Sequence, residues 1–210
     1  MKICKGLSTL ALGLAILINV QPLAAAETAG DVIKNTSSQV LVRLETEKAQ
    51  LEAHPDRIYE LINELVIPHF DFFSMSRYVL GTAWRSATEQ QQQAFVEQFK
   101  TLLVRTYANA LRQYSENEIV YYPEQTSEGS LLVVVRTEVK GANGANSIPI
   151  YYRMHSVEDA WKVVDVSIDG ISLVSTYRGS FASEIRKNGL DALIAQLTQR
   201  NQNTEATPTP

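Results

Sequence analysis

The chain has 210 residues, a formal net charge of -4 and one cysteine, Cys4. Residues 1–26 carry two lysines and no acid, so the rest of the chain has a charge near -6. That charge argues against a nucleic-acid partner and against a basic membrane-binding face. Without Cys4 the chain can form no disulfide, thiolate metal site or cysteine nucleophile, so a single hydrophobic core must stabilise it.

Residues 1–26 have the three parts of a cleavable secretory signal. Lys2 and Lys5 form the positive start, residues 10–18 are uniformly apolar or small, and residues 24–26 are three alanines. The alternative is an N-terminal membrane anchor, but the apolar segment is about half the ~20 residues that span a bilayer. We therefore predict cleavage after Ala26 and a soluble mature protein outside the cytoplasm.

Residues 28–80 are predicted to form helices. Apolar residues recur at near-helical spacing up to His54, and Pro55 suits the first turn of a second helix, which stops before Pro68. Asp71 can cap a short helix that ends at Gly81.

A longer helix follows. Thr88 and Gln91 fit a capping box at its start. Its apolar face is the most strongly periodic in the chain and carries Phe95, Phe99, Leu102, Leu103, Tyr107, Ala110, Leu111 and Tyr114.

Residues 118–169 alternate between apolar and polar side chains, which is typical of antiparallel strands with one apolar face. The turn residues are 140–144 and Glu158-Asp159. Helical spacing returns over 174–197 with a break at Asn188-Gly189, and the polar tail 201–210 is predicted to be disordered. This order of elements predicts one α+β domain over residues 27–200.

Motifs for catalysis or metal binding are absent from the sequence. His54, His69 and His155 lack ligand spacing, and no G-x-S-x-G motif occurs, so we predict no catalytic or metal residue. One enzymatic alternative stays open, in which an acid and a histidine in an apolar cavity abstract a proton. Its candidates also have structural explanations, as a helix cap, a turn or a solvent-facing side chain; they are Asp71, Asp165, Asp169, His69 and His155.

Several longer segments resemble the MlaC family, also called the toluene-tolerance auxiliary proteins. These segments are VIPHFDF (66–72), SRYVLG (76–81), TEQQQQAF (88–95), WKVVDV (161–166), DGISLV (169–174) and RKNGLDALI (186–194). They occur in the family's order, behind a signal peptide, and extend over nearly the whole mature chain.

The resemblance implies an NTF2-like fold, with N-terminal and C-terminal helices over a curved four-stranded antiparallel sheet that encloses an apolar cavity. It implies a periplasmic phospholipid carrier that helps to maintain the lipid asymmetry of the outer membrane, with phospholipid as cargo and no cofactor. The implied partners are an inner-membrane ABC transporter with a lipid-binding ring subunit and an outer-membrane lipoprotein–porin complex. We expect a monomer.

The apolar residues supply candidates for the cavity wall, although periodicity alone does not separate a cavity wall from a filled core. The predicted lining residues are Val66, Phe70, Phe73, Tyr78, Phe99, Leu103, Tyr107, Leu111, Val133, Val135, Ile150, Tyr152, Met154, Trp161, Val163 and Val174. Arg153 and Arg178 are candidates for contact with the headgroup phosphate, or are ordinary surface arginines. Gly81 and Asn188-Gly189 are candidate hinges. An enzyme with a small apolar substrate and a periplasmic protein-binding module remain as alternative functions.

Overall fold

The computed structural model describes residues 27–113, 117–126, 131–141 and 146–203, so the predicted signal lies outside the described residues. The first described part is helical: α1 (Ala29–Thr46), α2 (Lys48–Ala53), α3 (Arg57–Leu65), the 3-10 turn η1 (Ile67–His69), α4 (Phe72–Leu80), α5 (Thr82–Ser86) and α6 (Glu89–Gln113). The strands are β1 (Ile119–Tyr121), β2 (Gln125–Thr126), β3 (Leu132–Val139), β4 (Ile148–Val157), β5 (Ala160–Ile168) and β6 (Ile171–Ser172). Two further helices follow, α7 (Leu173–Asn188) and α8 (Leu190–Gln202).

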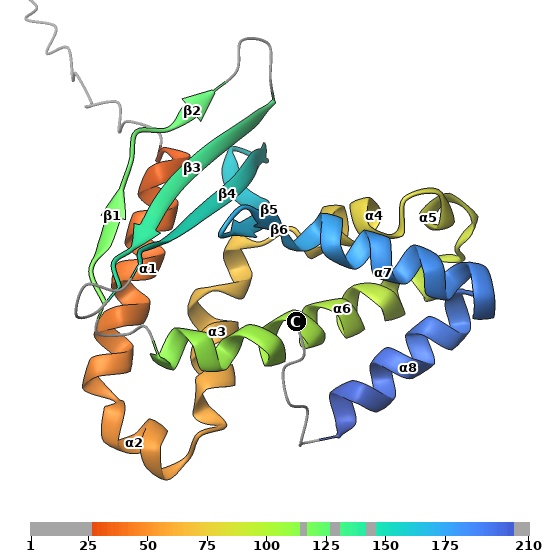
Figure 1. Cartoon of the computed structure of the whole chain (residues 1–210), viewed down its shortest axis with the longest axis horizontal. Coiled ribbons are helices and arrows are strands. Elements are labelled where there is room, and N and C mark those ends of the chain that lie inside the picture. Colours follow the sequence, from red (N-terminus) through yellow and green to blue (C-terminus); the bar gives the residue numbers. More distant parts are fainter. Residues whose placement is uncertain (1–26, 114–116, 127–130, 142–145, 204–210) are drawn as a thin grey trace, which may run out of the picture.

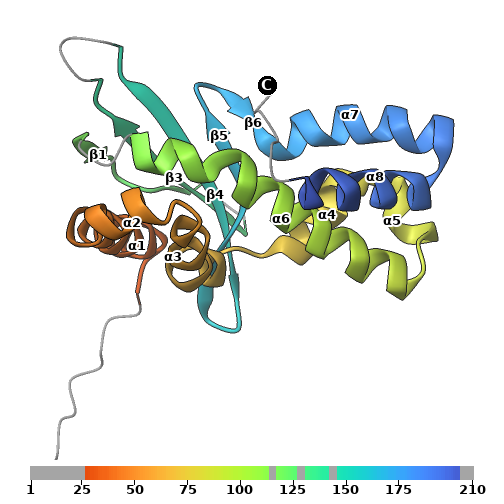
Figure 2. The same ribbon diagram turned by 90° about the horizontal axis from the view of Figure 1, so that it is seen from below.

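The molecule is elongated, and the helices at its two ends lie beside different elements of the fold. Figure 1 shows α1, α2 and α3 next to the sheet at one end, and α4, α5, α7 and α8 together at the other. α6 extends across both ends, which Figure 2 shows from below. This arrangement confirms the predicted α+β class.

Several local predictions are confirmed at the ends of helices. The Asp71 carboxylate accepts a hydrogen bond from the Ser74 backbone N–H at 2.9 Å, so Asp71 caps α4. Thr88 and Gln91 exchange the two bonds of a capping box, at 2.9 and 3.2 Å. Gly81 ends α4 with φ +56°, a conformation that side-chain-bearing residues rarely adopt.

The sheet has six strands among the described residues, not the four that the resemblance implied. Both β2 and β6 have only two residues. β2 pairs with β3, and β6 pairs with the end of β5. Strands this short contain too little alternation to be recognised in a sequence. Four longer antiparallel strands, β1, β3, β4 and β5, form the body of the sheet in that order.

One face of the sheet is buried under helices. On β3, burial alternates strictly, so that Val133, Val135, Thr137 and Val139 are buried. Opposite them on β4 lie Met154, Tyr152, Ile150 and Ile148, in register. A bulge at Arg153/Met154 shifts the pairing with β5, so that both Val163 and Val166 lie on this same face.

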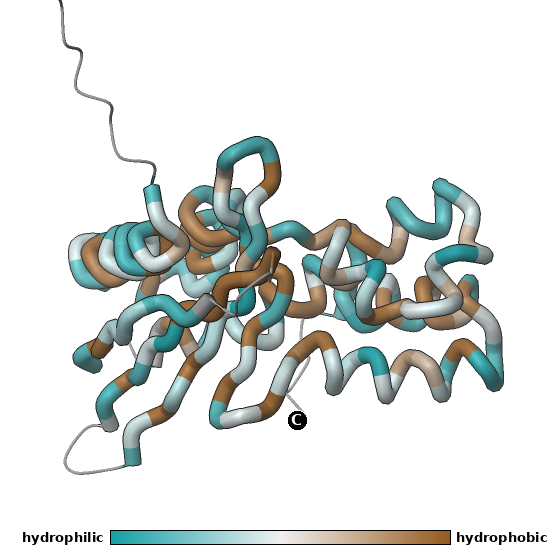
Figure 3. Tube along the Cα trace, turned by 90° about the horizontal axis from the view of Figure 1, so that it is seen from above, coloured by the Kyte–Doolittle hydropathy of each residue, from teal (hydrophilic) through white to brown (hydrophobic). Residues whose placement is uncertain are grey.

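A filled aromatic core occupies the end of the molecule that lies away from the sheet. Phe95 and Phe99 of α6 are fully buried and stack on each other, and Phe181 of α7 meets both edge to face. Hydrophobic residues of α4 and α8 complete this cluster. Figure 3 shows hydrophobic and hydrophilic positions interspersed along these helices, as expected where one face of each is buried.

The C-terminal helix extends two residues into the segment predicted to be a disordered tail. Asn201 is buried, and its side-chain amide donates hydrogen bonds to the backbone and side-chain oxygens of Gln98, both at 2.9 Å. These bonds hold the last turn of α8 against α6. Residues 204–210 lie outside the described residues.

Candidate functional site: an apolar cavity between helices and sheet

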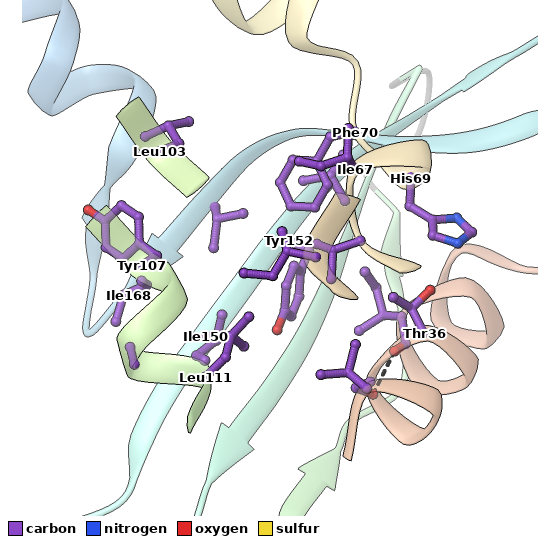
Figure 4. Close-up of a pocket in the computed structure, with 18 of the residues that line it drawn as sticks. Thr36, Ile67, His69, Phe70, Leu103, Tyr107, Leu111, Ile150, Tyr152 and Ile168 are labelled. Atoms are coloured by element: carbon purple, nitrogen blue, oxygen red, sulfur yellow. Dashed lines mark hydrogen bonds between the residues drawn. The ribbon is translucent and has the colours of Figure 1, made fainter. Parts of the chain in front are cut away.

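A cavity of about 320 Å³ lies between the buried face of the sheet and α1, α3, η1 and α6. This volume is at the lower end of the range of ligand pockets, roughly 300–1,000 Å³. Figure 4 shows its wall, with Thr36 of α1 and Tyr107 of α6 on opposite sides and Phe70 near η1. The cavity is partly open to solvent, and Leu111, at 36% exposure, lies at its rim.

The wall is almost entirely hydrocarbon. α1 supplies Ile33, Val40 and Leu44, and the sheet supplies a nearly continuous aliphatic surface. Such a surface offers no fixed charge to a ligand, so it selects for an apolar one.

Two polar side chains of the wall, Ser37 and Tyr107, interact with other groups of the protein. Ser37 donates to the Ile33 carbonyl at 2.7 Å and shares a 2.6 Å bond with the Tyr121 hydroxyl. Burial, together with the neighbouring Tyr177 hydroxyl, raises the pKa of Tyr107 to about 12. Tyr107 therefore stays neutral at every physiological pH, and neither Ser37 nor Tyr107 brings charge into the cavity.

His69 is the one histidine on the described wall. Burial lowers its pKa, and the nearby Lys162 charge lowers the pKa further. The imidazole is therefore neutral at pH 7, which is compatible with an apolar ligand next to it.

Half of the sixteen predicted lining residues lie on the cavity wall. These eight are Val66, Phe70, Leu103, Tyr107, Leu111, Ile150, Tyr152 and Val163. They come from η1 and its flanks, from the C-terminal half of α6 and from the centre of the sheet, so the fold brings together residues far apart in the chain.

The other eight lie elsewhere. Phe99 and Val174 belong to the filled aromatic core, while Val133, Val135 and Met154 are buried between α1 and the sheet, with Trp161 packed against them. Phe73 and Tyr78 are exposed on α4, at 54% and 41%. The Phe73 and Trp84 rings meet edge to face, and the Arg77 guanidinium lies over the Tyr78 ring.

Neither candidate headgroup arginine lies on the cavity wall. Arg153 is exposed on the opposite face of β4, between the inward-facing Tyr152 and Met154. Arg178 is exposed on α7, close to Gly81. Their role in headgroup contact stays a prediction.

The acids considered for catalysis have structural roles outside the wall. Asp71 caps α4 and forms a 2.9 Å hydrogen bond with His155. Asp165 is 4% exposed and accepts hydrogen bonds from the Val174 backbone N–H and the Ser172 hydroxyl, at 3.1 and 2.7 Å, at the start of α7. Asp169 lies in the turn between β5 and β6 with φ +51°. The geometry thus places no carboxylate of the described residues on the cavity wall.

Sequence reasoning missed much of the wall. The missed positions include Ile33, Val40 and Leu44 of α1, Ile62 of α3, and Ile67 of η1. The signal for the α1 residues was present as a helical apolar face, but nothing in that face says whether it lies against side chains or against empty space.

Two further features bear on the class of protein. Across the described ranges, no three His, Cys, Asp or Glu side chains are grouped so that they could hold a metal ion. None of the described helices has both the length and the hydropathy needed to span a membrane.

An α+β domain with an apolar cavity between its sheet and its helices belongs to the class of proteins that bind hydrophobic ligands. The comparisons with known proteins define the family, because a protein-family model described as MlaC protein matches residues 34–199. The chain therefore belongs to the MlaC family, as the resemblance predicted.

Individual relatives agree with this assignment. The chain is 32% identical over 188 residues to the toluene tolerance protein ttg2D of Pseudomonas putida, covering 88% of this chain and 86% of the relative. It is 24% identical over 179 residues to the intermembrane phospholipid transport system binding protein MlaC of Haemophilus influenzae, covering 84% of each.

A solved structure is similar to the whole described fold. It is the phospholipid-binding protein of Ralstonia solanacearum in complex with a phospholipid, with a TM-score of 0.74 and 30% sequence identity. The match covers 82% of this chain and 96% of that one. A relative with this fold thus holds a phospholipid.

Proposed function

We propose that this protein binds phospholipid, encloses the acyl chains in the apolar cavity, and carries the lipid between membranes. The cavity wall is the observation that carries the proposal, because an uncharged, largely aliphatic wall suits hydrocarbon. Membership in the MlaC family and the phospholipid in the Ralstonia solanacearum relative support the same ligand.

The physical requirement on a carrier is the removal of hydrocarbon from water. Each methylene contributes roughly 0.8 kcal/mol, so one acyl chain contributes on the order of 10 kcal/mol. Transfer between two such cavities needs no covalent step, so we propose a carrier and not an enzyme. The direction of transport would then depend on the partners.

We place the carrier in the periplasm. The predicted signal at residues 1–26 supports export, and the name of the Haemophilus influenzae relative refers to transport between membranes. The proposed partners are those of the family: an inner-membrane ABC transporter with a lipid-binding ring subunit, and an outer-membrane lipoprotein–porin complex. The carrier would act as a monomer.

Within the cavity, we propose that the eight wall residues predicted from the sequence contact the acyl chains. Leu111 at the rim offers the sharpest test, because it is accessible and its substitution leaves the buried core intact. Leu111→Glu would place a carboxylate in the path of the chains. Val42→Glu is the matched control, since Val42 lies on α1, is 57% exposed and does not line the cavity.

The experiment combines native mass spectrometry of protein from the periplasm with uptake of phospholipid from vesicles. The wild type and Val42→Glu should contain lipid and accept it from vesicles. Leu111→Glu should do so at least about tenfold less, because a bound acyl chain would cover the carboxylate and remove its water without giving it a partner. A wild-type protein that contains no lipid and accepts none would refute the proposed function.

A further inference from the structure

A second, smaller pocket lies between α3 and α6, where these two helices pack against each other (Figure 1). We call it the α3–α6 groove. Its volume is about 210 Å³, and it is lined by Tyr59 and Asn63 of α3 and by Lys100, Thr101, Val104 and Arg105 of α6. These side chains are half-buried or exposed, so a ligand can reach the groove from solvent.

The groove differs in chemistry from the apolar cavity. Of its lining residues, only Val104 also lines that cavity. The other five are polar, two of them carry a positive charge, and no carboxylate lies on the described wall of the groove. The chain beyond residue 26 has a net charge near -6, so a cationic groove is a local exception that attracts anions.

Arg105 is the first of the two cations, and the fold restrains its side chain. Its guanidinium lies over the Tyr59 ring, 6.0 Å from the ring centre, and Tyr59 packs against the apolar core of α1 and α3. Such a contact holds the planar group in place. Within the described part of the chain, the guanidinium has neither a carboxylate partner nor a hydrogen bond. Its N–H groups are therefore available to an acceptor from outside the protein.

Lys100 and Asn63 add donors from both sides of the groove. The Lys100 ammonium lies 2.6 Å from the Glu97 carboxylate, but Glu97 is 62% exposed and does not line the groove. An exposed pair of this kind contributes little, and an ammonium has three N–H donors, so Lys100 can also bind a ligand. The Asn63 amide has no hydrogen bond with the described residues and offers two N–H donors from α3.

The number of charges and donors indicates the class of anion. A phosphate monoester carries a charge of about -1.5 to -2 at pH 7 and three strong acceptor oxygens. It matches two cations and can accept hydrogen bonds from both helices. A carboxylate has a single charge and two oxygens in one plane, so it satisfies fewer of these groups.

We propose that the α3–α6 groove is a binding site for a phosphate group, with Lys100 and Arg105 as charged contacts and Asn63 as a neutral donor. The inference goes beyond the proposed carrier function and does not rest on it. Two sources can supply the phosphate. One is a free phosphate monoester, and the other is the headgroup of a lipid cargo, because Val104 lines both the groove and the apolar cavity.

The test is an NMR titration of isotope-labelled, delipidated protein with glycerol phosphate. The signals to follow are the Asn63 side-chain amide and the Arg105 Nε–H. Both should shift and saturate, and added salt should weaken binding because it screens the charges. Acetate at the same ionic strength is the control and should give no saturable shift. Equal saturation by acetate would overturn the phosphate assignment, and no saturable shift with glycerol phosphate would overturn the site.

Variants identify the groups that bind. Arg105→Gln and Lys100→Gln should each weaken binding at least about tenfold, because each loses a hydrogen bond between charged groups. Asn63→Leu should weaken binding about threefold to tenfold, as expected for a neutral donor. The signal of the unaltered residue reports binding in each variant. Arg85→Gln is the matched control, since Arg85 is exposed on α5 and does not line the groove. Equal weakening in Arg85→Gln would show that only net charge matters and would overturn the site.

Protein loaded with phosphatidic acid, whose headgroup is a phosphate monoester, separates the two sources. For a free monoester, loaded and delipidated protein should bind glycerol phosphate equally. For a lipid headgroup, the loaded protein should show the shifted Asn63 and Arg105 signals before any addition, and glycerol phosphate should not shift them further. Either result supports the site. A protein that takes up no lipid but binds glycerol phosphate would overturn the carrier function alone.

Discussion

Removal of the bound lipid should destabilise one end of the molecule selectively. In mutants of other proteins, an empty apolar void destabilises by roughly 24 cal/mol per Å³. For a closed, dry void of 320 Å³ this slope gives about 8 kcal/mol, which is an upper limit because the cavity is partly open. A lipid at about 1,000 times its Kd would contribute about 4 kcal/mol, so we expect a loss of that order on delipidation.

The loss of stability on delipidation should be confined to the elements that line the cavity. The cavity is lined by α1, α3, the C-terminal half of α6 and the sheet, whereas α7 and α8 pack in the filled aromatic core. Delipidated protein should therefore exchange its amide hydrogens faster in α1, α3 and β3–β5, with little change in α8 and in the part of α7 beyond Leu173.

The assay is hydrogen exchange with mass spectrometry on lipid-loaded and delipidated protein, accompanied by urea unfolding. The C-terminal helices serve as the internal control within each sample. Equal acceleration in α8 and in α1, or an unchanged free energy of unfolding after delipidation, would show that the cavity does not hold the lipid.

Three further predictions concern residues outside the cavity. Asp165→Ala should lower the free energy of unfolding in urea by about 1–3 kcal/mol, because the buried Val174 backbone N–H loses its acceptor and the half-buried Ser172 hydroxyl loses one of its partners; an unchanged value would refute this structural role of Asp165. Burial alone would raise the pKa of Asp71, but hydrogen bonds from Ser74 and His155 outweigh burial and lower that pKa. The ionised Asp71 therefore stabilises the folded state at pH values above its ordinary pKa of about 4, and this stabilisation is lost as the pH falls through the lowered folded-state pKa. Asp71→Asn should lack this loss, and parallel stability–pH curves for wild type and variant would contradict it. Gly81→Ala, at φ +56°, should lower the free energy of unfolding in urea by about 1–3 kcal/mol. If Gly81 is a hinge, the variant should also exchange lipid more slowly, and lipid exchange at the wild-type rate would exclude that role.

Much of the fold follows from local sequence signals, but the wall of the cavity does not. Phe99 and Leu103 are one helical turn apart on the same apolar face of α6, and a helical period cannot separate them. Phe99 is fully buried against the aromatic rings of α7, whereas Leu103 lies on the cavity wall. The difference depends on what lies opposite each residue, which is set by distant parts of the chain.

The bulge in the sheet is a second feature that alternation conceals. Regular alternation from Val163 would direct Asp165 toward the cavity, where it could act as a base. The bulge at Arg153/Met154 instead brings Val166 to the wall, and Asp165 turns away and accepts a hydrogen bond from the Val174 backbone N–H at the start of α7. A sequence pattern with period two carries no information about where one residue is skipped, so the sequence alone does not exclude an Asp165 side chain that faces the cavity.

The division of α6 between two environments explains how a domain of this size tolerates an unfilled cavity. Its first half is buried among the aromatic rings of α7 and packs against α4 and α8. Its second half, from Leu103 onward, lines the cavity with Tyr107, Ala108 and Leu111. Because one helix belongs to both, its packing in the aromatic core also holds the part of the cavity wall that α6 contributes. Stability and binding are thereby assigned to different parts of the same helix, and a substitution in one half of α6 should affect the two properties differently from a substitution in the other.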